Sequence, residues 1–145
     1  MGGVSTGTLT AETVAGRPAL RMRGEVRLEN NGGFVQMALD LAPGGRALDA
    51  RGFAAIELDV LGNDERYNLH LRTADVVRPW QSYRASFTAP PRWTTVQLAF
   101  DDFTPHRVAA PLDLATLRRI GIVAIGRAFT ADLAVGGVRL VEAVG

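Results

Sequence analysis

Residues 67–72 read Tyr67-Asn68-Leu69-His70-Leu71-Arg72, and apolar side chains alternate with polar ones through the whole stretch. Successive side chains of a β-strand point to opposite faces of a sheet, so the stretch predicts a strand with one buried and one polar face. The same alternation identifies strands at 35–39, 56–60, 83–87 and 96–100. Residues 19–23, 26–28 and 138–141 also read as strands, and 120–125 is a continuous apolar run.

Residues that favour chain reversal separate these strands, including Gly62-Asn63-Asp64 and Pro90-Pro91. Only residues 113–119 show a helical pattern, in which Asp113 would cap the first turn and two arginines would lie at the carboxyl end. Short strands at regular spacing with one short helix predict an all-β fold, an antiparallel sandwich or barrel.

The phase of the alternation also predicts which side chains form the core. Residues of one parity along a strand share one face of the sheet, and the apolar parity is the face that packs inward. The predicted interior residues are Tyr67, Leu69, Leu71, Phe87, Val96, Leu98 and Phe100, with Trp93 and Phe103 as further core anchors.

The chain has 145 residues, a net charge of +1, no cysteine and no lysine. Its length predicts one domain over residues 1–145. The small net charge argues against nucleic acid as a partner, and the lack of cysteine excludes disulfides and thiolate chemistry. No apolar run approaches the ~20 residues of a membrane-spanning helix, and no signal-peptide pattern is present, so we expect a cytoplasmic protein. Arginine without lysine is typical of GC-rich bacterial genomes.

The first seven residues match two functional motifs. Residues 3–7 fit the G-x-S-x-G nucleophile elbow of serine hydrolases, and Met1-Gly2 with Thr6 fits an N-myristoylation pattern. An elbow needs a preceding strand and a following helix, which an all-β chain beginning here does not offer Ser5. A bacterial origin argues against myristoylation. We therefore expect neither activity from this segment.

The order of turn and strand motifs along the chain resembles that of the complex I intermediate-associated protein 30 family. Six segments carry the resemblance, in the order that the family shows: residues 1–5 (Met-Gly-Gly-Val-Ser), 31–34 (Asn-Gly-Gly-Phe), 62–63 with 67–72 (Gly-Asn, then Tyr-x-Leu-x-Leu-Arg), 80–87 (an aromatic strand), 93 with 100–105 (Trp, then Phe-x-x-Phe-x-Pro) and 120–122 (Ile-Gly-Ile). The family usually carries one more strand before the first of these segments, so this chain is either a trimmed member of the family or begins at an internal start.

The resemblance implies a galactose-binding-like jelly roll, in which two antiparallel sheets pack face to face, as in some carbohydrate-binding modules. Eukaryotic members of the family resemble assembly chaperones for respiratory complex I. The resemblance thus implies a protein partner, with complex I subunits as the candidates. Fold alone does not transfer a function.

The candidate binding surface is the polar face of the strand at 67–72, where Asn68, His70 and Arg72 share one parity. If neighbouring strands are adjacent, Arg84, Gln97, Glu57 and Asp59 would join them. Such a face in a jelly roll binds sugar through arginine, amide and acid groups beside an aromatic platform, which Trp80 and Tyr83, flanking Gln81, could provide. The alternative is a solvent-facing sheet whose charges pair across strands.

Catalysis and metal binding have little support. His70 and His106 are the only histidines, and neither belongs to a recognisable catalytic set. Residues 63–65 or 101–102 could offer oxygen ligands to a structural calcium ion, but neither shows an ordered ligand series. We expect no enzyme activity, no catalytic residues and no cofactor.

Two functions remain open. The first is a non-enzymatic, assembly-factor-like module that contacts a protein partner through a sheet face and loops. The second is a carbohydrate-binding module that uses the polar face. Sugar binding requires Trp80 or Tyr83 to be exposed beside Arg72 and His70, whereas a chaperone requires a contiguous apolar patch.

Overall fold

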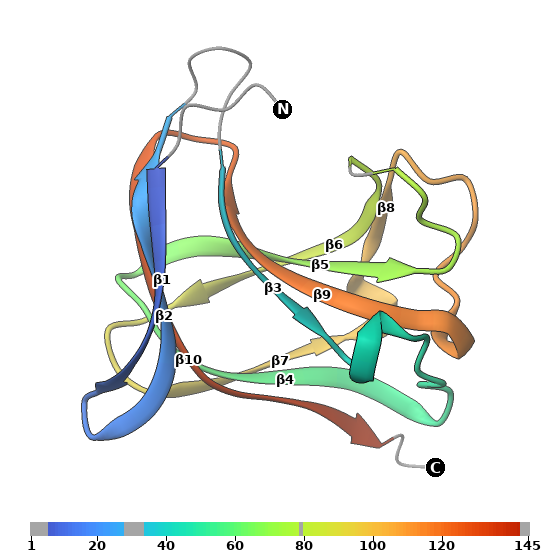
Figure 1. The fold of residues 1–145 in the computed structure, drawn as a ribbon, viewed down its shortest axis with the longest axis horizontal. Helices are drawn as coiled ribbons and strands as arrows, with labels where there is room; N and C mark the ends of the chain where they lie inside the picture. Colours follow the sequence, from blue (N-terminus) through green and yellow to red (C-terminus); the bar gives the residue numbers. More distant parts are fainter. Residues whose placement is uncertain (1–5, 28–33, 79, 143–145) are drawn as a thin grey trace.

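The computed structural model describes residues 6–27, 34–78 and 80–142, which form two five-stranded antiparallel sheets packed face to face (Figure 1). The first sheet has the order β1 (Thr6–Val14), β2 (Arg17–Val26), β10 (Phe129–Glu142), β4 (Phe53–Leu61) and β7 (Thr94–Ala99). The second has the order β3 (Phe34–Asp40), β9 (Leu117–Ile125), β5 (Glu65–Thr73), β6 (Ser82–Ala89) and β8 (Thr104–His106). The predicted antiparallel sandwich is confirmed.

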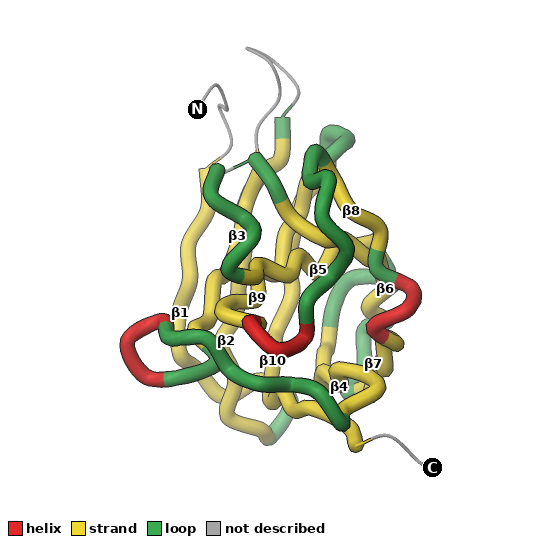
Figure 2. The backbone as a smooth tube through the Cα atoms, turned by 90° about the vertical axis from the view of Figure 1, so that its right-hand side faces the viewer, coloured by secondary structure: helices red, strands yellow, loops and turns green. Residues whose placement is uncertain are grey.

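The chain passes repeatedly between the sheets, because β3, β5, β6, β8 and β9 lie in one and the remaining strands in the other. Three 3₁₀ turns interrupt the connections: η1 (Pro43–Gly45), η2 (Phe100–Asp102) and η3 (Leu114–Thr116). Figure 2, which faces the right-hand end of Figure 1, shows these turns in red among the loops. The second sheet bends so that its outer face is hollowed, and we call this outer surface the concave face (Figure 1).

The alternation in the sequence gives the correct faces. Tyr67, Leu69 and Leu71 are fully buried between the sheets, while Asn68, His70 and Arg72 point the other way. Phe87, Leu98, Phe100 and Phe103 also belong to the core, as predicted, and Val96 packs against it while partly buried. Since one parity of each strand meets the opposing sheet, the register follows from the apolar pattern.

The predicted helix over 113–119 is wrong in extent. Asp113 does cap a turn, because its side chain accepts a hydrogen bond from the Ala115 backbone N–H at 3.0 Å, but the turn is the three-residue η3. From Leu117 the chain is β9, and Leu117 and Ile120 are fully buried. Burial of these side chains in the sandwich core outweighs the weak helical preference of a seven-residue segment. Residues 1–5, on which the nucleophile-elbow and myristoylation motifs depend, lie outside the described residues.

One buried hydroxyl joins the two central strands of the sandwich. Strand β4 ends at Leu61, so the β10 backbone near residues 130–132 continues beyond its β4 neighbour. The Tyr67 hydroxyl of β5 accepts a hydrogen bond from the Asp132 N–H at 2.9 Å and donates one to Asn63 Oδ1 at 2.6 Å. The Asn63 amide donates to the Thr130 carbonyl at 2.9 Å. Two side chains therefore satisfy the β10 groups that β4 no longer reaches.

The turn that positions Asn63 requires glycine at residue 62. A Cβ atom built on Gly62 would lie 2.7 Å from the carbonyl oxygen of Ala89, inside van der Waals contact. The Gly62 N–H donates to the Pro90 carbonyl at 2.8 Å, which holds this turn against the end of β6. The Gly-Asn…Tyr spacing of the sequence thus encodes a contact between the sheets.

We expect Tyr67→Phe to lower the free energy of unfolding by about 1–3 kcal/mol, because the buried Asp132 N–H and the Asn63 side chain each lose a partner. Chemical denaturation of the wild type, Tyr67→Phe, Asn63→Ala and the double variant measures this. The two single effects should be strongly non-additive, since both act on one network. Additive effects, or an unchanged unfolding midpoint for Tyr67→Phe, would contradict the role given to the hydroxyl.

Candidate functional site

The concave face is organised in rows across neighbouring strands. His70 of β5 lies directly opposite Arg84 of β6 on one side and Gly121 of β9 on the other. Gly121 in turn lies opposite Ala38 of β3, and Arg72 lies opposite Arg119 of β9. Polar side chains from strands far apart in the sequence therefore share one surface.

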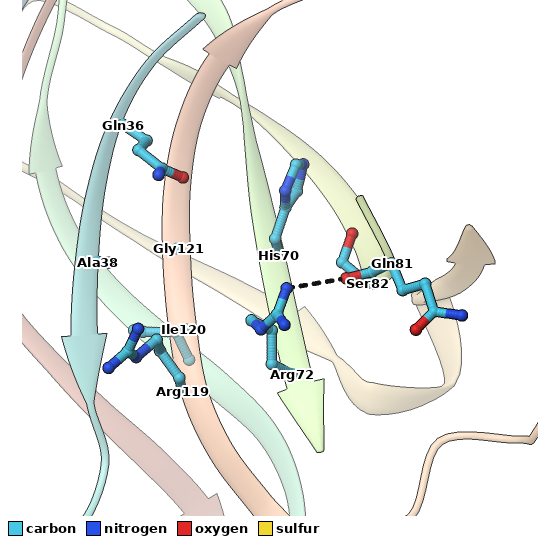
Figure 3. Close-up of a pocket in the computed structure, with 9 residues that line it drawn as sticks. All are labelled: Gln36, Ala38, His70, Arg72, Gln81, Ser82, Arg119, Ile120 and Gly121. Atoms are coloured by element: carbon cyan, nitrogen blue, oxygen red, sulfur yellow. Dashed lines mark hydrogen bonds between the residues drawn. The ribbon is translucent and has the colours of Figure 1, made fainter. Parts of the chain in front are cut away.

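A pocket of about 300 Å³ opens on this face (Figure 3). Its floor is low because Gly121 has no side chain and Ala38 has only a methyl group. A Cβ atom added at Gly121 would find its nearest neighbour, Val123 Cγ2, at 3.8 Å, an ordinary van der Waals contact, so a methyl group fits there without a clash. The pocket is lined by Gln36, Ala38, His70, Arg72, Gln81, Ser82, Arg119, Ile120 and Gly121.

His70 contributes an unused hydrogen-bonding atom to the pocket. Its Nε2 is buried and has no hydrogen-bond partner among the described residues. Burial, followed by the charges of Arg84 and His106, lowers the pKa of His70 to about 3. The imidazole is therefore neutral at physiological pH, and a buried polar atom without a partner is a place where a ligand group would be favourable.

The guanidinium of Arg72 is held in position by the loop between β5 and β6. Its Nη1 donates to the Gln81 carbonyl at 3.2 Å, drawn as a dashed line in Figure 3, and its Nη2 donates to the Arg78 carbonyl at 3.3 Å. Gln81 fixes that loop, since its Oε1 accepts from the Val77 and Arg78 N–H groups and its Nε2 donates to the Arg107 carbonyl. Burial, then Arg119 and Arg118, lowers the pKa of Arg72.

Tyr83 is not available as a stacking platform, which corrects the sequence-based expectation. Its ring is fully buried, and its hydroxyl donates to the Ala110 carbonyl at 2.6 Å. Tyr83 has the inward parity of β6, so it belongs to the core. Trp80 is 56% exposed, near the Arg78 guanidinium, and is the aromatic residue that remains for a ligand.

Glu57, Asp59 and Gln97 do not share the surface of Arg72 and Arg84, contrary to expectation. Strands β4 and β7, which carry them, belong to the first sheet. Asp59 accepts from Arg17 at 2.7 Å, from Arg139 at 2.8 Å and from Thr95 at 2.8 Å, while Glu57 accepts from Arg139 at 2.8 Å.

This cluster is a structural ion network. Hydrogen bonds from Arg139, Arg17 and Thr95 hold the pKa of Asp59 well below its usual range.

Asn68 does lie on the concave face, opposite Ser86, where it lines a second hollow together with Arg84.

Sequence reasoning missed Gln36, Ala38, Ser82, Arg119 and Gly121, which complete the pocket. The outward parity of Gln36 was visible in its alternating strand, whereas Gly121 lies in the continuous apolar run 120–125, where no alternation marks an outward face. No local pattern indicates that β9 lies between β3 and β5. Strand order is set by the packing of the whole chain.

The described residues do not form a metal site. Among the described residues, no three His, Asp or Glu side chains lie close enough together to hold a metal ion. Asn63, one candidate for calcium, uses its amide in the network with Tyr67 and Thr130. The described part of the chain also contains no helix that is long and apolar enough to span a membrane.

Residues 1–135 match the family model of complex I intermediate-associated protein 30. The chain belongs to this family. The motif order in the sequence had predicted the assignment, and the contacts of Asn63 and Tyr67 give one of those motifs a physical meaning. No curated protein matches the sequence.

Solved carbohydrate-binding modules share the fold of this family member. A family 11 module of the cellulase Lic26A-Cel5E from Clostridium thermocellum superposes with a TM-score of 0.76 at 15% identity, covering 97% of this chain and 84% of that chain. The same module in complex with a β-1,3-1,4-mixed-linked tetrasaccharide gives 0.76 at 14% identity, covering 97% and 85%. A family 30 module gives 0.72 at 16% identity, covering 95% and 75%. At these identities the likeness establishes the fold.

We expect acid to destabilise the protein partly through His70. The unfolded chain binds a proton at this residue near pH 6.5, whereas the folded protein does so only near pH 3. The unfolded state therefore binds more protons between these values, and stability falls as the pH drops through this window. His70→Gln should lose less stability between pH 7 and pH 4 than the wild type, as measured by urea unfolding.

His106→Gln provides the control, because His106 is the less deeply buried histidine. This variant should keep most of the acid sensitivity of the wild type. Ring signals of His70 in NMR that titrate near pH 6.5 in the folded protein would contradict the assignment.

Proposed function

We propose that this protein is a non-enzymatic binding module that holds an oligosaccharide on the concave face of its second sheet. The observation that carries the proposal is the pocket floored by Gly121 and Ala38 and walled by hydrogen-bonding side chains. Pockets of about 300–1,000 Å³ with a few fixed polar groups are typical of small-ligand sites.

The chemistry of the pocket suits sugar hydroxyl groups. Gln36 offers both a donor and an acceptor, Arg72 offers donors in fixed positions, and neutral His70 offers one of each type. The buried Nε2 of His70 has no partner among the described residues, so a ligand hydroxyl would satisfy it. Trp80 does not line the pocket, but it is 56% exposed in the β5–β6 loop that holds Arg72, and in this proposal it stacks on a sugar ring beyond the pocket.

The same features support binding without catalysis. The low pKa of His70 leaves the ring without the affinity for a proton that base catalysis near neutral pH needs. A carbohydrate-binding module of similar fold has been solved with a bound tetrasaccharide, which supports a glycan as the ligand class.

A protein partner is the second candidate, as the family name implies. The observation that favours it is the loop between β5 and β6, where Val77 is 74% exposed and Trp80 is 56% exposed. Two exposed apolar side chains close together in a loop suit a protein contact. Subunits of respiratory complex I are the partners that the family name suggests for this surface.

Filling the pocket tests the glycan proposal. Gly121→Val should abolish oligosaccharide binding while leaving the fold intact, because a Cβ at this position makes only ordinary van der Waals contacts and the added methyl groups would fill the pocket. A glycine within a strand costs about 0.5–1 kcal/mol relative to alanine, so the variant should be at least as stable as the wild type. Isothermal titration calorimetry against ligands chosen from a glycan array measures the binding, and thermal unfolding measures the stability.

Val77→Ser with Trp80→Ala tests the second candidate in the same experiment. Loss of glycan binding in Gly121→Val supports the concave face as the site. Undiminished glycan binding in that variant would place the ligand elsewhere. No glycan binding by the wild type, together with a complex I subunit that binds the wild type but not the loop variant, would replace the proposal with the second candidate.

A further inference from the structure

The outer faces of the two sheets differ in which charged side chains lie opposite each other on neighbouring strands. On the outer face of the first sheet, Arg139 of β10 lies directly opposite Glu57 of β4, and the two form a salt bridge of 2.8 Å. On the concave face, Arg72 of β5 lies directly opposite Arg119 of β9. Arg119 also lies opposite Asp40 of β3, so it has an anion on one side and a second cation, Arg72, on the other.

Like charges directly opposite on neighbouring strands destabilise a sheet. The fold limits this cost by holding each guanidinium from its far side. Arg119 donates through Nε to Asp40 Oδ1 at 2.8 Å, and Arg72 donates to two backbone carbonyls of the β5–β6 loop. Both arginines line the pocket, together with Gly121 and Ala38 (Figure 3).

On the described outward strand positions of the second sheet, cations outnumber carboxylates. The described outward positions of the second sheet also carry Arg66 and Arg84, and Asp40 is the carboxylate among them. Asp40 accepts from Arg119 through one nitrogen, and the terminal nitrogens of Arg119 have no partner among the described residues. The lowered pKa of Arg72, due to burial and then to Arg119 and Arg118, is consistent with a concentrated positive field.

We propose that the pocket lined by Arg72 and Arg119 binds an anionic group, the carboxylate or sulfate of an acidic oligosaccharide. This inference rests on the proposed function and names the class of glycan. A guanidinium binds a carboxylate or sulfate through paired charge-assisted hydrogen bonds, which are stronger than those to a neutral hydroxyl. An anion between the two arginines would also remove their mutual repulsion.

The neutral groups of the pocket then recognise the sugar. His70 Nε2 and the Gln36 amide line the same pocket and suit hydroxyl groups next to the anion. The neighbouring hollow that Arg84 lines also contains Asp102, whose carboxylate would repel an anion. The anionic subsite is therefore confined to the pocket lined by Arg72 and Arg119, and the ligand needs one charged sugar there.

The experiment compares ligands that differ in charge on one backbone. Oligogalacturonate is measured against its methyl ester, and sulfated dextran oligomers against plain dextran oligomers, by calorimetry at two salt concentrations. At least one acidic ligand should bind about tenfold or more tightly than its neutral counterpart. The preference should weaken with salt, and which pair shows it distinguishes carboxylate from sulfate.

Three variants assign the effect to the pocket. Arg72→Gln and Arg119→Gln should each reduce the affinity for the acidic ligand toward that of the neutral one. Arg92→Gln removes the same charge from an exposed position in the β6–β7 turn and should leave binding unchanged. Gly121→Val should abolish binding of both ligands of a pair.

The outcomes separate this inference from the proposed function. Equal binding of acidic and neutral glycans, lost in Gly121→Val, would overturn the anionic subsite and keep the glycan site. An equal loss of affinity in Arg92→Gln, or equal binding of oligoglutamate, would show that overall charge is recognised and would overturn the assignment to a sugar. No glycan binding in either class would overturn both proposals.

Discussion

The hydroxyl of Tyr67 determines how the two sheets are held together. Strand β10 extends beyond the end of β4, and its Asp132 N–H and Thr130 carbonyl would otherwise lie without partners at the sheet boundary. Tyr67, from the centre of the opposite sheet, and Asn63, from the following turn, satisfy both groups. Burial raises the pKa of Tyr67 to about 12, so the hydroxyl keeps its proton and donates to Asn63. This network fixes β5 against β10, and the position of β5 determines where His70 and Arg72 lie.

The inward and outward faces of β5 have separate tasks. Tyr67, Leu69 and Leu71 supply the core and the contact between sheets, while the residues between them form the polar concave face. A strand with period two can perform both tasks because neighbouring side chains point in opposite directions. The first sheet uses its outer face differently, since Asp59 gathers two arginines and a threonine into an ion network.

Family and fold constrain the function of this chain less than the pocket does. Membership of the complex I intermediate-associated protein 30 family and likeness to carbohydrate-binding modules suggest different partners. One fold can serve unrelated functions, so the function has to be inferred from the residues of the binding site. The small floor at Gly121, the positioned guanidinium of Arg72 and the unsatisfied atom on His70 are the observations on which the proposal of a polar ligand rests.

The sequence alone determined most of the strands, their buried faces and the family, because alternation and turn residues are local properties of the chain. It also placed Asn68, His70 and Arg72 on one polar face. It missed β1, β8 and the first part of β10. It failed for Tyr83, whose parity puts the ring in the core, and for Asp59, whose strand lies in the other sheet. Only the tertiary structure brought Arg119 and Gly121 beside Arg72 and His70. The physical reason is that strand order depends on long-range packing and chain crossings between sheets, which leave no local periodicity in the sequence.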